Sequence, residues 1–256
     1  MKILVCLKQI PDMESKFRIN EEGIWYDEAN LAWRINEYDE YAVEQAVQVK
    51  EQLGGAEVVA LSLGPARVKE AIKKALAMGC DRGVHINDEE GWRRDPFEIA
   101  SLIAGYAKEE GFDLVFTGMQ SQDRGSAQVG VLLAGMLGLP AMTTVVDFAL
   151  EDGAVRVKRE LEGGMKACVK CNLPAVVTCQ LGLNTPRYPT LPNIMKAKRK
   201  EMQTIEAADL AAAGSRLVTD RLAFPEKKGG GLVLEGEAAD LAGKLATILR
   251  DKIKVL

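Results

Sequence analysis

Histidine is almost absent from this chain of 256 residues, in which His85 is the single example. His85 stands between Val84 and Ile86 in an apolar segment, a setting more typical of a packed side chain than of a general base. Nucleophile–base triads that use histidine are therefore nearly excluded. The sequence also lacks HExxH and DxD motifs and any cluster of His and Cys ligands for a metal. Such a chain is typical of a carrier or a binding module, not of an enzyme.

An excess of positive charge is missing too, because the formal net charge is −4. A slightly acidic chain is a poor candidate for nucleic-acid binding, which needs a basic face to displace counterions. No apolar run approaches the roughly 20 residues that cross a bilayer. The first residues, MKILVCLKQIPD, have no small-residue cleavage site and predict a strand rather than a signal peptide, so we expect a cytoplasmic protein.

The five cysteines form an odd and scattered set, unlike the framework of a small disulfide-rich domain. Cys168 and Cys171 make a CxxC, but in a strand an offset of three places two side chains on opposite faces. No second CxxC completes a zinc site. We therefore expect two packing thiols.

Strand-like and helix-like segments alternate through the first half of the chain. The predicted strands are residues 2–9, 57–64, 82–87 and 113–118, and the predicted helices are residues 40–55, 65–80, 95–111 and 126–138. Continuous apolar strands that alternate with helices are typical of a parallel sheet with helices on both faces. The sequence thus predicts an α/β fold with a parallel, doubly wound, flavodoxin-like sheet.

The pattern changes after Pro140. Two strand-like runs are separated by Asp152 and Gly153, a strong hairpin signal, and further strand-like runs follow. Three prolines in TPRYPTLPNIMKAKRK predict that residues 185–200 are extended or looped, and a last amphipathic helix is predicted at 237–255. We expect a core of residues 1–184 with added hairpin strands, then an arm of residues 185–256 that needs a partner surface to cover its apolar side chains.

The stretch GFDLVFTGMQSQDRGSAQVGVLLAGMLGLP, residues 111–140, reads as a strand, a small-residue loop and a helix. Helix N-termini at the carboxyl ends of parallel strands bind phosphate through unpaired main-chain N–H groups, without any lysine. The residues that suit this role are Gly118, Gly125, Ser126, Gln128 and Gly130. Asp123 would repel a phosphate, so we expect it to cap the loop or meet a sugar hydroxyl. A plain turn with Ser126 as helix cap explains the loop equally well, and Asn36 is the predicted cap of the first helix.

Four segments of the sequence resemble the β (small) subunits of electron transfer flavoproteins. They are VCLKQIPD, INEYDEYAVEQAVQVKE, LVFTGMQSQDRGSAQVGVLLAGMLGLP and the run from RELEGG to LPAVVTCQLGLNTPRYPTLPNIMKAKRK. The resemblance spans residues 1 to about 200. It implies an adenine nucleotide α-hydrolase-like fold and a heterodimer with an α subunit that holds most of one FAD.

The same resemblance implies a structural AMP in this subunit and a set of residues around it. Those residues are Cys6, Asn36, Glu37, Tyr38, Asp39, Leu63, Gly118, Gln120, Asp123, Gly125, Ser126, Ala127, Gln128 and Val129. Ala127 and Val129 replace the Asn and Thr of some relatives, so the phosphate contacts must come from the main chain. Met13 falls where some relatives place an aromatic residue near the flavin.

The resemblance also implies a docking segment around Leu191, Pro192 and Lys196 for a flavoprotein dehydrogenase. A small apolar anchor suits weak, fast-releasing association, and the neighbouring basic side chains suit an acidic partner. Electrons would pass from the dehydrogenase through FAD to a quinone reductase.

Three alternatives stay open at this point. Some relatives bind a second FAD in place of AMP and split electron pairs. A stand-alone adenine-nucleotide module of the universal stress type has the same fold but no use for a long arm. A nucleotide-hydrolysing enzyme of the α-hydrolase type would need an SGGxDS-like loop after the first strand, which KQIPDMES lacks.

Overall fold

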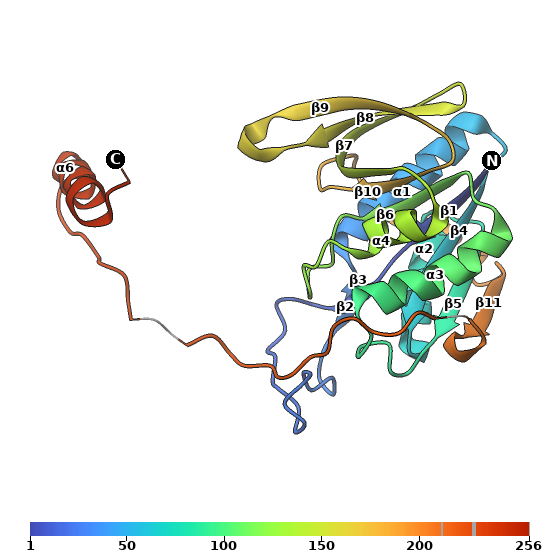
Figure 1. Cartoon of the computed structure of the whole chain (residues 1–256), viewed down its shortest axis with the longest axis horizontal. Coiled ribbons are helices and arrows are strands. Elements are labelled where there is room, and N and C mark those ends of the chain that lie inside the picture. Colours follow the sequence, from blue (N-terminus) through green and yellow to red (C-terminus); the bar gives the residue numbers. More distant parts are fainter. Residues whose placement is uncertain (211, 227–228, 256) are drawn as a thin grey trace. The chain divides into compact units, whose positions relative to one another are not determined.

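The computed structural model describes residues 1–210, 212–226 and 229–255 (Figure 1). The chain divides into two compact units, Met1–Arg221 and Leu222–Leu256. The first unit continues past the boundary predicted after residue 184, because the chain there returns to the sheet and to a helix. The Arg187 guanidinium pairs with the Glu44 carboxylate at 2.8 Å, and the strand Met202–Glu206 extends the sheet.

In the described residues, nine strands form one mixed sheet in the order β11-β5-β4-β1-β6-β10-β7-β8-β9. The strands are β1 (Lys2–Cys6), β4 (Glu57–Gly64), β5 (Arg82–Asn87), β6 (Leu114–Gly118), β7 (Ala141–Glu151), β8 (Ala154–Glu160), β9 (Lys166–Asn172), β10 (Ala175–Cys179) and β11 (Met202–Glu206). Pairing is parallel from β11 through to β7 and antiparallel in β7-β8-β9. The predicted parallel sheet with added hairpin strands is confirmed.

Helices cover both faces of the parallel part (Figure 1). One face packs on α1 (Glu37–Leu53) and α2 (Lys69–Met78), which follows a short 3-10 turn, η1 (Ala66–Val68). The other packs on α3 (Pro96–Glu110) and α4 (Val129–Leu137). The sheet is therefore doubly wound, because apolar side chains leave both faces of its buried strands.

Local signals in the sequence explain where several elements start and stop. Gly54 ends α1 in the left-handed region with φ 68°, which glycine adopts without a steric penalty. Asp95 caps α3 by accepting a hydrogen bond from the Glu98 N–H at 2.8 Å, and Pro96 occupies the first turn. Gly153, with φ 66°, turns the chain between β7 and β8 as predicted.

Several predicted boundaries are wrong by a few residues, and two of these errors have a clear structural reason. The strand predicted at residues 2–9 is two strands, because β1 stops at Cys6 and a short β2 (Gln9–Pro11) pairs with β3 (Trp33–Ile35). The helix predicted from Ser126 begins at Val129, because Ala127 lies in the left-handed region with φ 51° and cannot continue a helix.

The prediction of an extended or looped segment at residues 185–200 is wrong for its second half. A short helix, α5 (Leu191–Ala197), forms there with Pro192 in its first turn. The Thr190 hydroxyl accepts a hydrogen bond from the Asn193 N–H at 3.4 Å and caps this helix. Proline blocks helix interiors, but its fixed φ suits the first turn, and the prediction overlooked that exception.

Cys168 and Cys171 lie on opposite faces of β9, as expected. The expectation of two packing thiols holds for Cys171, which packs against the core, but not for Cys168, which is exposed. Beyond β9 the edge of the sheet is free of other strands in the part of the chain that the structure describes.

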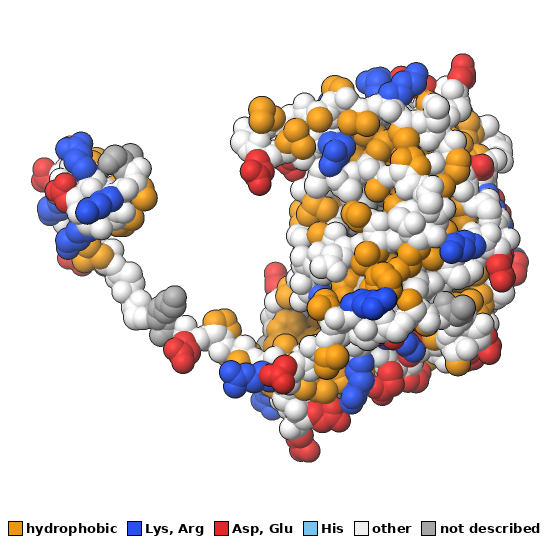
Figure 2. Space-filling model, viewed as in Figure 1, with side chains coloured by type: hydrophobic (Ala, Val, Ile, Leu, Met, Phe, Trp, Pro, Cys, Tyr) orange, Lys and Arg blue, Asp and Glu red, His pale blue; other side chains and the backbone are white. Residues whose placement is uncertain are grey.

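The second unit contains α6 (Ala238–Ile248), followed by a π-helical turn at Leu249–Ile253, so the predicted last helix forms. No side chain of α6 is buried. Figure 2 shows hydrophobic side chains over the end of the β7–β9 strands and over α4 in the first unit. Among the described residues, no helix is long and apolar enough to span a membrane.

Candidate functional site

A cavity opens at the carboxyl ends of β1 and β6, next to the start of α4. After β1 the chain moves to one side through β4 and β5, and it then returns to the other side of β1 as β6. The crevice between β1 and β6 is thus the point where the winding direction changes. Ligands of doubly wound sheets bind at such points.

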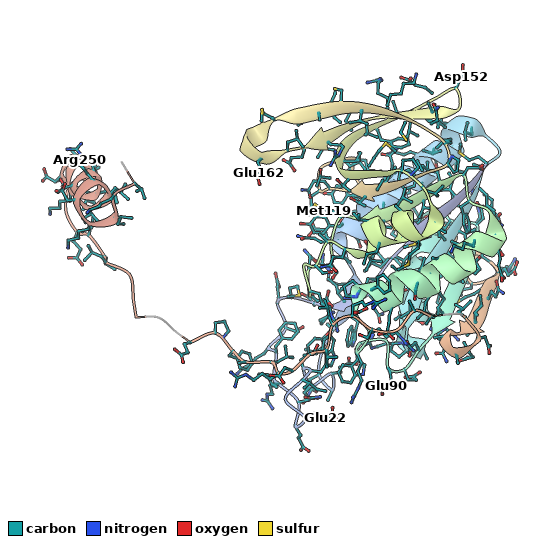
Figure 3. All side chains as sticks on the ribbon, in the orientation of Figure 1. Glu22, Glu90, Met119, Asp152, Glu162 and Arg250 are labelled. Carbon is teal, nitrogen blue, oxygen red and sulfur yellow. The ribbon has the colours of Figure 1, made fainter. Side chains whose placement is uncertain are left out.

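Most of the predicted nucleotide residues come together around this cavity. Those that line it are Cys6, Asn36, Asp39, Leu63, Gly118, Gln120, Asp123, Ser126, Ala127, Gln128 and Val129. Glu37, Tyr38, Gly125 and Met13 do not line it. Met13 is exposed in the segment after β2, and Met119 marks the loop after β6 in Figure 3.

The start of α4 leaves main-chain N–H groups without protein partners. Gln128 occupies the cap position, but its side chain makes no capping hydrogen bond. Within the described residues, no hydrogen bond involves the N–H groups of residues 126–131, and the helical ladder starts with the Leu132 N–H at 2.9 Å from the Gln128 carbonyl. Ser126 therefore does not cap this helix as the alternative reading expected. Unpaired N–H groups at a helix start attract anions.

Two glycines allow the chain segments around the start of α4 to approach one another closely. A Cβ atom on Gly118 would lie 2.2 Å from Asp39 Oδ1, and one on Gly130 would lie 2.5 Å from Thr117 Oγ1 and 2.8 Å from Thr178 Cγ2. Any larger residue at either position would push α4 or α1 away from the strand ends. The glycines predicted from the sequence thus act through close packing.

The start of α1 holds the loop that follows β6. Asn36 donates from Nδ2 to the Gln120 carbonyl at 2.8 Å, and Asn36 Oδ1 accepts from the Gln122 N–H at 3.0 Å. Asp39 accepts from the main-chain N–H groups of Lys8 at 2.7 Å and Gly118 at 3.0 Å. Asn36 occupies the cap position of α1 as predicted, but its side chain makes no cap bond, because both of its polar atoms are bonded to the loop.

Asp123 pairs with Lys8 and does not cap the loop as one prediction had it, while its contact with a sugar hydroxyl stays a prediction. Lys8 Nζ lies 2.6 Å and 2.8 Å from the two carboxylate oxygens of Asp123 and 3.4 Å from Ser121 Oγ. The loop has no lysine of its own, yet the end of β1 supplies one from a distant point in the sequence. Burial lowers the pKa of Lys8, while the Asp123 carboxylate acts in the opposite direction.

Burial also shifts the titration of two groups beside the strand ends. It raises the pKa of Asp39 to about 7, although the N–H groups of Lys8 and Gly118 stabilise the carboxylate. It raises the pKa of the Cys6 thiol, and the nearby Asp39 adds to that rise. Cys6 therefore stays a neutral thiol at physiological pH and is not activated as a nucleophile.

Four aromatic residues, missed at the sequence level, form a wall that also lines the cavity. Its members are Trp25, Tyr26, Trp33 and Trp92, and Arg67 and Arg124 line the cavity beside them. All three tryptophans of the chain belong to it. Aromatic residues are only 5% of the sequence, so the occurrence of Trp25, Tyr26 and Trp33 within nine positions is an unusual local concentration. It could have been used to predict an aromatic surface.

The segment of residues 12–32 carries part of this wall and is fastened to the core. Trp25 stacks on Trp92 with ring centroids 5.3 Å apart, and the Arg124 guanidinium lies 4.8 Å from the Trp25 ring centroid. Glu22 pairs with Arg93 at 2.9 Å, near Glu90 at the same edge of the core (Figure 3). The segment thus closes one side of the cavity.

A second link of this segment involves the turn after β4. The Arg67 guanidinium pairs with Glu28 at 3.0 Å and lies 3.5 Å from the ring centroid of Trp33. His85 supports the same turn, because its Nε2 lies 2.8 Å from the Gly64 carbonyl oxygen, and the ring is fully buried as the sequence suggested. Among the described residues, no group of three or more His, Cys, Asp or Glu side chains is placed to hold a metal ion.

Comparison with known proteins identifies the family. A model of the electron transfer flavoprotein domain matches residues 23–210. The chain is 39% identical to the electron transfer flavoprotein subunit beta of Bacillus subtilis, over the full length of both proteins. The subunits beta of Methylophilus methylotrophus and Homo sapiens are 36% and 38% identical, each over 98% of both chains.

The chain belongs to the electron transfer flavoprotein β-subunit family. The resemblance seen in the sequence is thereby confirmed, and the reading as a universal-stress module or an α-hydrolase-type enzyme is set aside. The matched region includes the cavity loop and α5, but not residues 1–22 or the second unit.

The residues predicted to dock a partner lie on α5 of this β-subunit fold, apart from the cavity. Leu191 is 79% exposed, and Met195 and Ile194 on the same helix are exposed as well. Pro192 and Lys196 are also exposed, while Ala197 is buried and anchors the helix on the core. Lys200, from the predicted basic run, donates to the Leu76 carbonyl at 2.9 Å at the end of α2, so it is not free to meet a partner.

Proposed function

We propose that this chain is the β subunit of a heterodimeric electron transfer flavoprotein. It would accept electrons from flavoprotein dehydrogenases and pass them to a quinone reductase, with AMP held as a structural group in its own cavity. FAD, held mainly by an α subunit, would supply the reversible uptake and release of electrons. Membership of the β-subunit family and the open start of α4 support this proposal.

The open N–H groups of residues 126–131 are the single observation that carries the nucleotide assignment. A phosphate at this point would satisfy donors that the described protein leaves unpaired, and it would complement the positive end of the helix. The contact needs only main-chain atoms, so Ala127 and Val129 serve as well as polar residues. Lys8 reduces the repulsion that Asp123 would exert on a phosphate, because the two side chains are paired.

The cavity holds a nucleotide without consuming it. Cys6 is a neutral thiol, and His85 lies outside the cavity lining. Asp39 already accepts two main-chain N–H groups, and the Asp123 carboxylate is paired with Lys8. A general base must reach the proton that it removes, and none of these groups is free to do so. AMP is thus a structural element that fills the crevice between β1 and β6.

The test is to co-express the chain with its α subunit, purify the yellow complex and identify its nucleotides by mass spectrometry after acid extraction. We expect one FAD and one AMP per heterodimer. A complex with one FAD and no adenylate would reject the AMP assignment.

A second FAD in place of AMP is the alternative that one observation favours. The aromatic wall formed by Trp25, Tyr26, Trp33 and Trp92 offers planar surfaces on which a flavin ring could stack. Such a complex would yield two FAD and no AMP in the same extraction, which would point to a subunit that splits electron pairs.

The docking role of Leu191 has its own test. Truncation to Leu191→Ala removes an exposed apolar anchor, so we expect slower electron transfer from the dehydrogenase at unchanged flavin content. Leu53→Ala, at an exposed leucine near the end of α1, is the matched control and should leave transfer unchanged. Equal rates for the wild type and Leu191→Ala would remove Leu191 from this role.

A further inference from the structure

The segment that leads into α5 has no regular structure of its own. Residues 185–190 form neither helix nor strand, yet they end directly before Leu191, the exposed side chain with the proposed docking role. An apolar anchor on an unfixed segment would lose conformational freedom when it binds, and that loss weakens association. Contacts that hold residues 185–190 on the core would remove this cost before the partner arrives.

Arg187 makes such contacts with two residues of α1. Its guanidinium meets the Glu44 carboxylate side-on, with Nε 2.8 Å from Oε2 and Nη2 3.0 Å from Oε1. The main-chain N–H of Arg187 also donates to Glu44 Oε2, at 3.1 Å. Nη1 and Nη2 donate to the two carboxylate oxygens of Glu51 at 2.6 Å and 3.0 Å. Arg187 thus binds two carboxylates at once and fixes its own main chain as well.

The pair with Glu44 is costly to open. The Glu44 side chain is only 5% exposed, so departure of Arg187 would leave a buried charge without its partner. Asn184 adds a neutral contact just before, because its Nδ2 donates to the Tyr41 carbonyl at 3.0 Å. The chain is therefore held along α1 before it reaches the docking helix.

The anchored residue lies close enough to Leu191 to fix its place. Four positions separate Arg187 from Leu191, and Pro189 lies between them. The ring of Pro189 fixes its own φ, and that of Pro192 fixes the first turn of α5. Because the short connection has few freely rotating bonds, the position of Arg187 limits the position of the docking side chain.

A second arginine shows what such an ion pair does when only stability is at stake. Arg82 also binds two carboxylates, Glu57 at 2.8 Å and Glu110 at 2.9 Å, but on the face of the sheet that α3 covers, whereas α5 packs on the other face. The Arg82 side chain is the more buried of the two, 16% exposed against 33% for Arg187. Its loss should therefore cost at least as much stability without touching the docking segment.

We propose that Arg187, through Glu44 and Glu51, is a positioning residue that holds the segment before α5 so that Leu191 is presented to the dehydrogenase in one orientation. The inference rests on the proposed docking role of Leu191 for its functional consequence. The contacts of Arg187 with α1 do not depend on that role.

Arg187→Lys in the purified heterodimer tests the proposal, because it keeps the positive charge but cannot bind two carboxylates side-on. We expect the half-saturating concentration of the heterodimer, in flavin reduction driven by the dehydrogenase, to rise about fivefold. The limiting rate and the flavin content should not change. Arg82→Lys is the matched control and should leave the half-saturating concentration unaltered. An equal rise in both variants would show a general loss of stability and would overturn the proposal.

A double substitution asks whether Arg187 acts through the docking leucine. In a Leu191→Ala background, Arg187→Lys should raise the half-saturating concentration no further, since the side chain that it positions is gone. The full rise in both backgrounds would mean that Arg187 contacts the partner by itself. Glu51→Gln removes the more exposed carboxylate, which is 55% exposed, and should give a smaller rise with little risk to folding.

Hydrogen exchange gives a readout that does not need the dehydrogenase. The Ile194 N–H donates to the Thr190 carbonyl at 2.9 Å in the first turn of α5. We expect this amide to exchange several-fold faster in Arg187→Lys and at the wild-type rate in Arg82→Lys. If Leu191→Ala leaves electron transfer unchanged, the proposed docking role fails. Unaltered exchange at Ile194 in Arg187→Lys would reject the positioning role by itself.

Discussion

Helix α3 follows β5 and helix α4 follows β6, and both begin at the same edge of the sheet, yet their first turns differ. At α3 the Asp95 carboxylate accepts from the Glu98 N–H at 2.8 Å and from the Leu217 N–H at 2.8 Å. The Ser101 hydroxyl accepts from the Ala213 N–H at 2.9 Å, so a later part of the chain lies across this helix start. At α4 no side chain of the described residues caps the helix.

This difference distinguishes a helix start that the protein itself satisfies, at α3, from one that can bind a ligand, at α4. A capped start is stable by itself, since a side-chain cap contributes about 1 kcal/mol. An uncapped start leaves its donors to water or to a ligand. The α3 end is closed by the protein's own chain, and the α4 end opens into the cavity. Substitutions at the two helix starts test this contrast.

Gly130→Val should have the largest effect. The new side chain would collide with Thr117 and Thr178, so the start of α4 must move off the sheet. We expect the free energy of unfolding to fall by about 2–3 kcal/mol, with loss of bound AMP, measured by urea unfolding and nucleotide extraction. Gly135→Ala, where a Cβ meets nothing within 4 Å, is the control and should be neutral or stabilising. Retention of AMP in Gly130→Val would contradict the inference that the start of α4 must lie close to Thr117 and Thr178.

Asp95→Ala should lower the free energy of unfolding by about 2 kcal/mol, because it removes a helix cap and leaves the N–H groups of Arg216 and Leu217 without their acceptor. AMP content should not change. Gln128→Ala at the equivalent position of α4 should shift the free energy of unfolding by less than about 0.5 kcal/mol. Equal losses in the two variants, measured by denaturant unfolding, would show that the two helix starts do not differ.

The contributions of Asp95 and Asp39 to the free energy of unfolding should also change with pH in opposite directions. Burial acts to raise the pKa of Asp95, but the N–H groups of Glu98, Arg216 and Leu217 outweigh it and lower that pKa, so its contribution is lost as pH falls below about 4. Asp39, beside the α4 loop, has a pKa raised from 3.8 to about 7. Folding favours its protonated form, so its contribution is present at low pH and is lost as pH rises towards 7.

The unfolding free energies of the wild type and of Asp39→Asn, measured between pH 5 and pH 8, test this sign. We expect the wild type to lose about 2–3 kcal/mol relative to the variant over that range, almost all of it below pH 7, since one titrating group contributes at most about 1.4 kcal/mol per pH unit. A difference that grows in favour of the wild type with rising pH would mean that Asp39 is stabilised as a carboxylate.

Capping the open helix start should give the smallest effect on stability. Both Gln128→Asn and Gln128→Asp supply a side-chain cap, so each should raise the free energy of unfolding by about 0.5 kcal/mol. Only the aspartate places a negative charge beside the phosphate, so only Gln128→Asp should weaken AMP retention several-fold. Equal retention in the two variants would place the phosphate away from this end of α4.

Much of the fold could be predicted from the sequence because its signals are short in range. Apolar runs marked β4 and β5 at their observed limits, and Asp152 with Gly153 marked the β7–β8 hairpin. The errors came where a local rule had an exception. Pro192 was read as a helix breaker although it lies in the first turn of α5, and the left-handed backbone of Ala127 delayed the start of α4.

The candidate site was predicted only in part, for a different reason. The glycines and small residues after β6 are visible as a pattern, and strand-end loops of a parallel sheet are the expected binding region. The pairing of Lys8 with Asp123 joins residues that are 115 positions apart, and no local pattern encodes it. The aromatic wall likewise combines Trp25, Trp33 and Trp92, of which Trp33 belongs to β3 and the other two to connecting segments.

Local signals in the chain are sufficient to predict the alternation of strands and helices, the parallel sheet and the position of the hairpin. Hydrophobic periodicity and turn chemistry act over a few residues, and they can be interpreted without knowledge of the packing partners. Tertiary contacts, by contrast, select which helix start stays open, which side chains hold the loop beside it and which charges meet in the cavity. Those choices depend on hydrogen bonds between distant segments, whose partners become known only when the chain is folded.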